Sequence, residues 1–262
     1  MGEAIVTRIS ESHETGLSAS WIGSAQSLLS TVVIAVFVIT FVIQAFQIPT
    51  ESMEDTLLVG DYLLVDKLHY GGQLGAPIIP YQLIHHGDII VFHYPVEPAK
   101  HFVKRVIGVP GDHVRLINRQ VYVNGTPVPE PYAVHKIGDH QVFRDEFPRL
   151  NIPADGIEGK WWLQMQKLVE DGQLIVPEKS YFVMGDNRDD SSDSRYWGFV
   201  PQENVIGRPL IIYWSLKKAD EDMPRSPTIG DKTIGDKISH FAYAITHIVQ
   251  ITRWNRTFRV VR

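Results

Sequence analysis

The longest apolar run of the chain lies near its amino terminus. No residue from Thr15 to Thr50 is charged, and Leu28–Phe46 is apolar apart from four hydroxyl or amide side chains. Such a stretch, if helical, rises about 28 Å, close to the hydrocarbon thickness of a bilayer. The run is too uniformly apolar for an ordinary amphipathic core helix, and it lacks the basic start and small-residue end of a cleaved secretory signal. It therefore predicts one transmembrane helix that is retained as an anchor.

Downstream of this run the hydrophobic positions fall into short, β-branched stretches, a pattern typical of strands. Gln120 to Val128 shows it most clearly, because two such stretches flank Asn124-Gly125, a pair that tolerates positive φ and favours a tight hairpin. The other predicted strands are Tyr62–Val65, Asp88–Tyr94, Phe102–Val109, His113–Ile117, Tyr181–Met184 and Val205–Trp214. We therefore expect a mostly β fold, an antiparallel-sheet body preceded by one amino-terminal transmembrane helix.

The middle of the chain differs from the rest of the predicted body. Residues 129–177 have clustered prolines and weak periodicity, with a short predicted helix around Trp161–Val169. We interpret this section as a second lobe inserted into the β body. The predicted divisions are an amino-terminal segment 1–27, the anchor 28–46, a first part of the β core 47–128, the inserted lobe 129–177, a second part of the β core 178–223, and a carboxyl-terminal segment 224–262.

The carboxyl-terminal segment combines a linker with an amphipathic pattern. Pro224–Asp236 contains the sequence TIG twice and is typical of a linker. Apolar residues then recur at helical spacing from Ile238 to Val249, followed by arginines at 253, 256, 259 and 262. One interpretation is a helix on a membrane surface with a basic tail drawn to anionic lipid. A helix docked on the body is the other.

Composition removes several classes of function. The chain has 262 residues, a net charge of −5 and a pI of about 6.1, so no global basic field favours binding to nucleic acid. It has no cysteine, which excludes disulfides, thiolate zinc sites and cysteine nucleophiles. The eleven histidines are scattered without metal-ligand spacing. We expect no metal and no cofactor, and a histidine-based hydrolase using His101 and His113 stays open as a minor alternative.

Three stretches carry residues that suit chemistry. Directly after the anchor, Pro49 and the polar residues up to Thr56 favour a turn that presents Ser52 at a fixed height, although a plain linker would have the same composition. Lys104 lies inside an apolar run, where it either points to water or is desolvated and acts as a base. Residues 185–201 form a polar loop that suits a rigid support or a solvated surface. Its arginines argue against a calcium site.

Four motifs in this order resemble the bacterial type I signal peptidases, membrane-bound serine endopeptidases that remove signal peptides from exported proteins. They are IPTESM, GDYLLVDK, KRVIGVPGD and GDNRDDSSDSRYWGFVP. The resemblance runs from about Phe46 to Ile211, with the middle insertion excepted. A single short motif occurs easily by chance, whereas four in order are specific.

The resemblance implies a Ser-Lys dyad, with Ser52 as nucleophile and Lys104 as general base. It assigns the oxyanion donors to the Ser52 backbone N–H and the hydroxyl of Thr50, where the family commonly has serine. Ser191 matches the serine that orients the lysine, and Asp193 and Arg195 match a supporting ion pair. The positions that resemble the walls of two small substrate pockets are Phe46, Ile48, Pro49, Met53, Leu57, Phe102 and Val103.

The same resemblance implies partners and a location. The expected partners are the lipid bilayer and the signal peptides of preproteins, cleaved after small residues. Arg8 before the anchor, with no further basic residue until Lys67, slightly favours a cytoplasmic amino terminus. This places a single-pass protein in the bacterial inner membrane with its body on the outer side, whereas many relatives have two amino-terminal membrane helices. No oligomeric state is predicted.

Two alternatives use the same residues differently. Self-cleaving transcriptional repressors share Ser-Lys chemistry, but they are soluble and carry a DNA-binding region, which neither the anchor nor the charge supports. A membrane-anchored β-domain that binds peptides or scaffolds a partner without catalysis is the non-enzymatic alternative. Intact Ser52, Lys104 and Ser191 argue against it.

Overall fold

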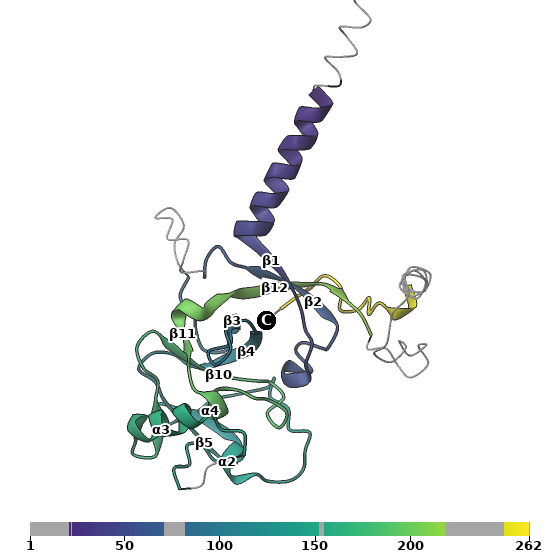
Figure 1. The fold of residues 1–262 in the computed structure, drawn as a ribbon. Coiled ribbons are helices and arrows are strands. Elements are labelled where there is room, and N and C mark those ends of the chain that lie inside the picture. Colours follow the sequence, from purple (N-terminus) through teal and green to yellow (C-terminus); the bar gives the residue numbers. More distant parts are fainter. Residues whose placement is uncertain (1–20, 22, 71–81, 152–154, 218–248, 262) are drawn as a thin grey trace, which may run out of the picture. The chain divides into compact units, whose positions relative to one another are not determined.

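The computed structural model describes residues 21, 23–70, 82–151, 155–217 and 249–261 (Figure 1). The chain divides between Gln44 and Ala45 into two units, and each is described by itself.

The amino-terminal unit is a helix. Its α-helical part covers residues 23–37 and continues as a π-helical turn, Val38–Val42. The span Gly23–Thr40 has a mean hydropathy of 1.8 and none of it is buried, so its length and composition suit a membrane crossing. The predicted extension of the helix to Phe46 was wrong, because Ile43–Gln47 is extended and forms strand β1. Strand β1 lies in the sheet of the larger unit, so pairing within that sheet, which the apolar pattern does not show, takes the place of the helix here.

The larger unit contains an eight-stranded sheet with the order β1-β2-β12-β3-β4-β10-β11 and with β13 paired to β12. The register is antiparallel at every pairing described for its strands from β2 onward. The strands after β1 are β2 (Asp61–Asp66), β3 (Ile89–His93), β4 (His101–Gly108), β10 (Ser180–Met184), β11 (Val200–Pro201), β12 (Val205–Ser215) and β13 (Arg259–Val260). The mostly antiparallel β prediction is therefore confirmed, and the strands predicted for this sheet agree within one residue at each end.

A five-stranded second sheet has the order β7-β6-β5-β9-β8. Its strands are β5 (His113–Ile117), β6 (Gln120–Val123), β7 (Thr126–Pro127), β8 (Val169–Glu170) and β9 (Gln173–Ile175). The predicted hairpin is present, with positive φ at both Asn124 and Gly125.

The second sheet begins earlier than the predicted lobe. The lobe was placed at 129–177, but β5 and β6 lie before residue 129 and pair within the same sheet as β8 and β9. The reason is packing, because Val114 and Leu116 of β5 share one buried cluster with Leu174 of β9. Sequence spacing alone does not show which sheet a strand joins.

Three helices accompany these sheets in the described part of the larger unit. They are α2 (Val142–Asp145), α3 (Gly159–Leu168) and α4 (Ser194–Trp197). The predicted helix around Trp161 corresponds to α3, whose first turn is capped by the Glu158 carboxylate accepting from the Trp161 N–H at 2.8 Å. Trp161 and Met165 of α3 pack in the same buried cluster as the second sheet.

The carboxyl-terminal segment docks on the body in its described part. Ile238–Ile248, most of the predicted amphipathic stretch, lies outside the described residues. After it, Thr252 bridges Leu216 and β13 pairs with β12. The membrane interpretation was wrong for Arg253 and Arg256, since both side chains contact the carboxylate of Asp61 in the body.

Phe182 joins the two sheets. It belongs to β10 of the first sheet, is fully buried, and packs in the cluster formed mainly by the second sheet and α3. Its ring lies 5.4 Å from that of Phe147, which hydrogen-bonds through its backbone to Leu116 of β5. The sheets therefore share one apolar core at this side chain.

We expect Phe182→Ala to lower the free energy of unfolding by about 3–5 kcal/mol, because it leaves a cavity between the sheets. The matched control is Phe258→Ala, whose ring is 73% exposed and whose loss should cost less than about 1 kcal/mol. Urea titration of the detergent-solubilised chain, followed by tryptophan fluorescence, measures both. Equal losses for the two variants would contradict this role for Phe182.

Candidate active site

Ser52 lies on a tight turn between β1 and β2. The turn is a single 3₁₀ turn, Glu51–Met53, preceded by extended backbone at Thr50. Apolar anchoring fixes its position, because Met53 and Leu57 are buried in one core cluster and the Leu57 N–H donates to the Met53 carbonyl at 2.7 Å. The turn therefore holds the serine hydroxyl against the body, with 9% of the residue exposed.

Lys104 reaches this hydroxyl from the middle of β4. The strand places Lys104 opposite Ile90 of β3, and only 4% of the lysine is exposed. Its Nζ donates to the Ser52 Oγ at 2.7 Å. Two residues 52 positions apart in the chain thus form the hydroxyl–amine contact that the sequence predicted.

The surroundings of Lys104 favour its neutral form. Burial lowers the pKa of Lys104 from the ordinary 10.5 to about 8, although Asp193 and Asp186 oppose this change. Exposed Lys100 behaves in the opposite way, because its hydrogen bond with Glu97 raises its pKa. At pH 7 an amine with a pKa of about 8 is mostly protonated, but its neutral fraction, roughly a tenth, is far larger than that of an ordinary lysine. The neutral amine is the form that accepts a proton.

Asp193 and Arg195 form a buried ion pair beside this amine. The Arg195 Nε and Nη2 donate to the two carboxylate oxygens of Asp193, each at 2.8 Å. Burial alone would raise the pKa of Asp193, but the guanidinium holds it below its usual range. The Asp193 carboxylate also accepts from the Gly185 N–H at 3.2 Å. The predicted pair is therefore present and braces the start of the polar loop.

Ser191 lies against the Ser52 turn but makes a different contact from the one predicted. A methyl group at Gly185 would lie 2.3 Å from the Ser191 Oγ and 2.4 Å from the Ser52 carbonyl, so these groups crowd around a glycine. The Ser191 Oγ is buried, and within the described residues it has no hydrogen-bond partner. The expected hydrogen bond to Lys104 is thus not formed here, because the hydroxyl lies over Gly185 instead.

Sequence reasoning missed two residues of the polar loop that hold the nucleophile turn. The Asn187 N–H donates to the Ser52 carbonyl at 3.1 Å, and its Nδ2 donates to the Glu51 carbonyl at 3.3 Å. Asp186 accepts from Thr56 Oγ1 at 2.5 Å and from Arg105 at 2.7 and 2.8 Å. The sequence places both residues inside the polar loop, but it does not show that they bind the turn.

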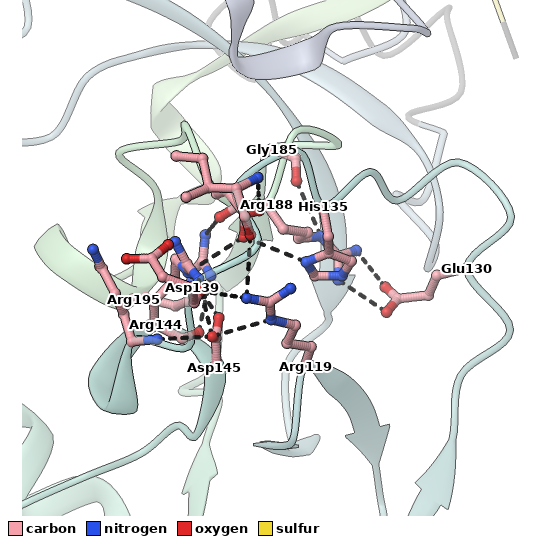
Figure 2. Close-up of polar contacts among 12 residues, drawn as sticks. Arg119, Glu130, His135, Asp139, Arg144, Asp145, Gly185, Arg188 and Arg195 are labelled. Atoms are coloured by element: carbon pink, nitrogen blue, oxygen red, sulfur yellow. Dashed lines mark hydrogen bonds and ion pairs between the residues drawn. The ribbon is translucent and has the colours of Figure 1, made fainter.

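A wider set of ion pairs and hydrogen bonds joins this loop to residues 119–145 (Figure 2). Arg188 makes a two-pronged contact with Glu130, and Arg144 contacts both Asp145 and Asp189. Arg195 joins the set through its bond to the Arg144 carbonyl at 3.0 Å. Buried charges of this kind need partners on every side, so the loop is held in one conformation.

Thr50 places a hydroxyl near the nucleophile, with its Oγ1 3.5 Å from the Ser52 Oγ. Thr50 is exposed as a residue, although its contact with Ser52 is partly buried.

The predicted pocket residues fall into two groups. Ile48, Met53 and Leu57 are core residues, and Phe46 and Val103 pack partly buried against them. Phe102 belongs to another cluster, where its ring stacks on Tyr94 at 4.4 Å and lies 5.4 Å from the Lys104 Nζ. Pro49 is exposed. Phe46, Pro49, Phe102 and Val103 are therefore the members that keep some exposed surface.

No group of three or more histidine, aspartate and glutamate side chains with metal-binding geometry occurs in the part of the chain that the structure describes.

Comparison with known proteins gives consistent matches. A family model described as signal peptidase, peptidase S26, matches residues 21–214. A signal peptidase I from Pseudomonas fluorescens is 36% identical over 195 residues, covering 67% of this chain and 66% of the relative. A probable signal peptidase I-2 from Synechocystis sp. is 33% identical over 224 residues, covering 83% and 84%. A crystal structure of a signal peptidase I from Enterococcus faecalis V583 matches with a TM-score of 0.36 and 31% identity, covering 48% of this chain and 97% of that one.

We expect Asp193→Asn to lower the pKa of Lys104 below 8. The variant removes an anion that favours the ammonium form and leaves the positive charge of Arg195 unbalanced beside it. A pH titration of ¹³C-labelled lysine by NMR measures the change. Glu97→Gln, which removes the partner of exposed Lys100, is the control and should leave Lys104 unaffected. An unchanged or higher pKa in Asp193→Asn would show that Asp193 does not act on this amine.

Proposed function

The chain belongs to the signal peptidase family, peptidase S26, and from that premise we propose that it is a membrane-anchored serine endopeptidase that removes signal peptides from exported preproteins. The observation that carries the proposal is the 2.7 Å contact between the Ser52 hydroxyl and the buried Lys104 amine. A nucleophile within hydrogen-bond reach of a base with a lowered pKa is the arrangement that acyl transfer requires.

The proposed reaction uses these two side chains both to form the acyl-enzyme and to hydrolyse it. Neutral Lys104 takes the proton of the Ser52 hydroxyl as its oxygen attacks the scissile carbonyl, and the resulting ammonium gives a proton to the leaving amine. An acyl-enzyme on Ser52 remains. Water then attacks this ester while Lys104 accepts its proton and returns one to the Ser52 oxygen. Each half begins and ends with neutral Lys104.

The oxyanion of each tetrahedral intermediate needs two donors. In this proposal they are the Ser52 backbone N–H and the Thr50 hydroxyl, which lies near the nucleophile. Threonine retains the hydroxyl donor that the family commonly supplies from serine, but its methyl group restricts the χ1 angle of the side chain.

The edge of β4 suits an extended substrate. β10 pairs with β4 only from Arg105 to Gly108, whereas β3 pairs with it from His101 onward. Within the described ladders, His101–Lys104 thus has backbone groups free on the β10 side. A signal peptide that adds as a strand there gains main-chain hydrogen bonds and lies beside Lys104. Small side chains next to the cut are favoured because Phe102 and Val103 are partly buried.

The proposed location follows from the anchor. The span Gly23–Thr40 crosses the bacterial inner membrane once, with the amino terminus in the cytoplasm and the body on the outer side, where exported preproteins emerge. Lipid and signal peptide are then the two partners of the chain.

We expect Ser52→Ala and Lys104→Met each to lower preprotein cleavage by about 10³-fold or more, since each removes one member of the dyad. Ser192→Ala, at an exposed serine, and Lys100→Met, at an exposed lysine, are matched controls that should retain cleavage. Gel analysis of a preprotein incubated with each detergent-solubilised variant measures the rates. Processing that survives Ser52→Ala or Lys104→Met would overturn the dyad and leave an anchored β-domain as the better account.

We expect Thr50→Val to lower kcat by about 10²-fold through the loss of one oxyanion donor, whereas Thr50→Ser should stay near the parent rate. Valine keeps the size and branching of threonine, so the pair isolates the hydroxyl. Steady-state kinetics with a signal-peptide substrate measures kcat and KM. If both variants retain the parent kcat, the second oxyanion donor lies elsewhere.

A further inference from the structure

The carboxyl-terminal segment, residues 249–261, returns to the body beside the nucleophile turn. Thr252 bridges Leu216, and β13 pairs with β12 through Ile211 and Ile212. The family model ends at residue 214, so this segment lies beyond the matched region. None of its residues takes part in the proposed reaction.

Two arginines of this segment converge on one buried carboxylate. Asp61, at the start of β2, is fully buried. Its Oδ2 accepts from the Arg256 Nη2 at 2.5 Å, and its Oδ1 accepts from the Ser215 Oγ at 2.5 Å. The Arg253 Nε donates to the same Ser215 Oγ at 2.8 Å. A buried carboxylate with these charge-assisted partners is tightly restrained.

The same two guanidinium groups also bind the backbone that follows Ser52. Arg256 Nη2 donates to the Thr56 carbonyl at 3.0 Å, and Arg253 Nη2 donates to the Val59 carbonyl at 2.7 Å. The Asp61 carboxylate accepts from the Leu58 N–H at 2.9 Å. Arg253, Arg256 and Asp61 together therefore hydrogen-bond to the backbone of three of the four residues 56–59.

This stretch is linked to the sequence neighbours of both members of the dyad. The Leu57 N–H donates to the Met53 carbonyl, which closes the turn that carries Ser52. The Thr56 hydroxyl donates to Asp186, which in turn binds Arg105, the neighbour of Lys104. A shift at Thr56 thus moves the serine side and the lysine side together.

Side-chain packing alone does not restrain Thr56 on the face that it turns toward the carboxyl-terminal segment. A cavity of about 360 Å³ lies there, lined by Thr56, Ile212 and Arg259 to Val261. Because this side is open, the bond from Arg256 is the contact that restrains Thr56 there.

We propose that Arg256, assisted by Arg253, is a positioning residue that sets the place of Ser52 by clamping residues 56–59 to Asp61. The proposal rests on the proposed function for its effect on rate, but not for its effect on the turn. The carboxyl-terminal segment is then a part of the active-site architecture, joined to it by one guanidinium whose Nη2 donates to both the Asp61 carboxylate and the Thr56 carbonyl.

The deciding variant is Arg256→Lys, which keeps the charge but lacks the second donor, the Nε that Arg256 places 3.3 Å from Asp61 Oδ1, and the planar group that fixes the position of Nη2. We expect kcat for a signal-peptide substrate to fall about 10-fold or more, with KM changed less than about twofold, because the turn and not the substrate edge is disturbed. Arg259→Lys is the matched control, an exposed arginine three residues further along, and should keep kcat within about twofold.

Hydrogen–deuterium exchange of the full-length protein gives a readout that needs no activity. In Arg256→Lys, amides in peptides covering residues 53–59 should exchange about 10-fold faster or more, while those of the hairpin 120–127 keep their rate. Faster exchange everywhere would indicate loss of global stability and overturn the proposal. So would parent kcat together with parent exchange.

Arg253→Lys is the second variant should Arg256→Lys fail to fold. It removes the bond to Val59, and we expect the same pattern with a smaller loss of kcat. An unchanged kcat for a folded Arg253→Lys would then overturn the proposal. If the parent protein does not cleave preproteins at all, the proposed function fails, while the exchange experiment still decides whether Arg256 holds the turn.

Discussion

The structure depends on one contact, a lysine amine brought out of water and against a serine hydroxyl. Burial that lowers the pKa of Lys104 to about 8 corresponds to about 3 kcal/mol in favour of the neutral amine. No local sequence feature supplies this, because a strand lysine ordinarily extends to solvent. The body supplies it by closing three separate stretches around one side chain: β4, the turn at Ser52 and the loop that begins at Gly185. The rest of the fold serves to keep these stretches together.

The charges around the dyad act in opposite directions, and their balance matters more than any single pair. An anion close to Lys104 favours the ammonium form over the neutral amine, yet Asp193 and Asp186 both lie near it. Each is matched by an arginine, Arg195 for Asp193 and Arg105 for Asp186. These pairs restrain the loop through their bonds, and Arg195 also opposes the effect of Asp193 on the pKa of the amine. The network thus gives a fixed site while leaving the amine neutral enough to accept a proton.

Much of this was accessible from the sequence, and the remainder has a physical reason. Periodicity located the strands, and the ordered motifs located Ser52, Lys104 and the Asp193–Arg195 pair, because local pattern and motif order are written in the chain. The end of the helix was misplaced, since an apolar run does not mark where intrahelical bonds give way to strand pairing at Ile43. The contacts of Asn187 and Asp186 were missed because they join residues more than 80 positions apart. The side chain of Ser191 was expected on Lys104, but its hydroxyl lies close over Gly185 and makes no hydrogen bond within the described residues.

The position of Arg256 shows that a residue outside the four motifs can contact the stretch that follows Ser52. The Ser52 turn is held before the serine by β1, which lies beside β2 in the first sheet, so the restraint from Arg256 acts on the residues that follow the serine. Apolar packing at Met53 and Leu57 fixes the inner face of this turn, but it is not directional and permits small rotations. Hydrogen bonds to backbone carbonyls are directional, and a guanidinium that holds Asp61 and Thr56 at once fixes two points with one rigid group. The buried carboxylate at the start of β2 is therefore the point at which the last described segment of the chain meets the turn that carries Ser52.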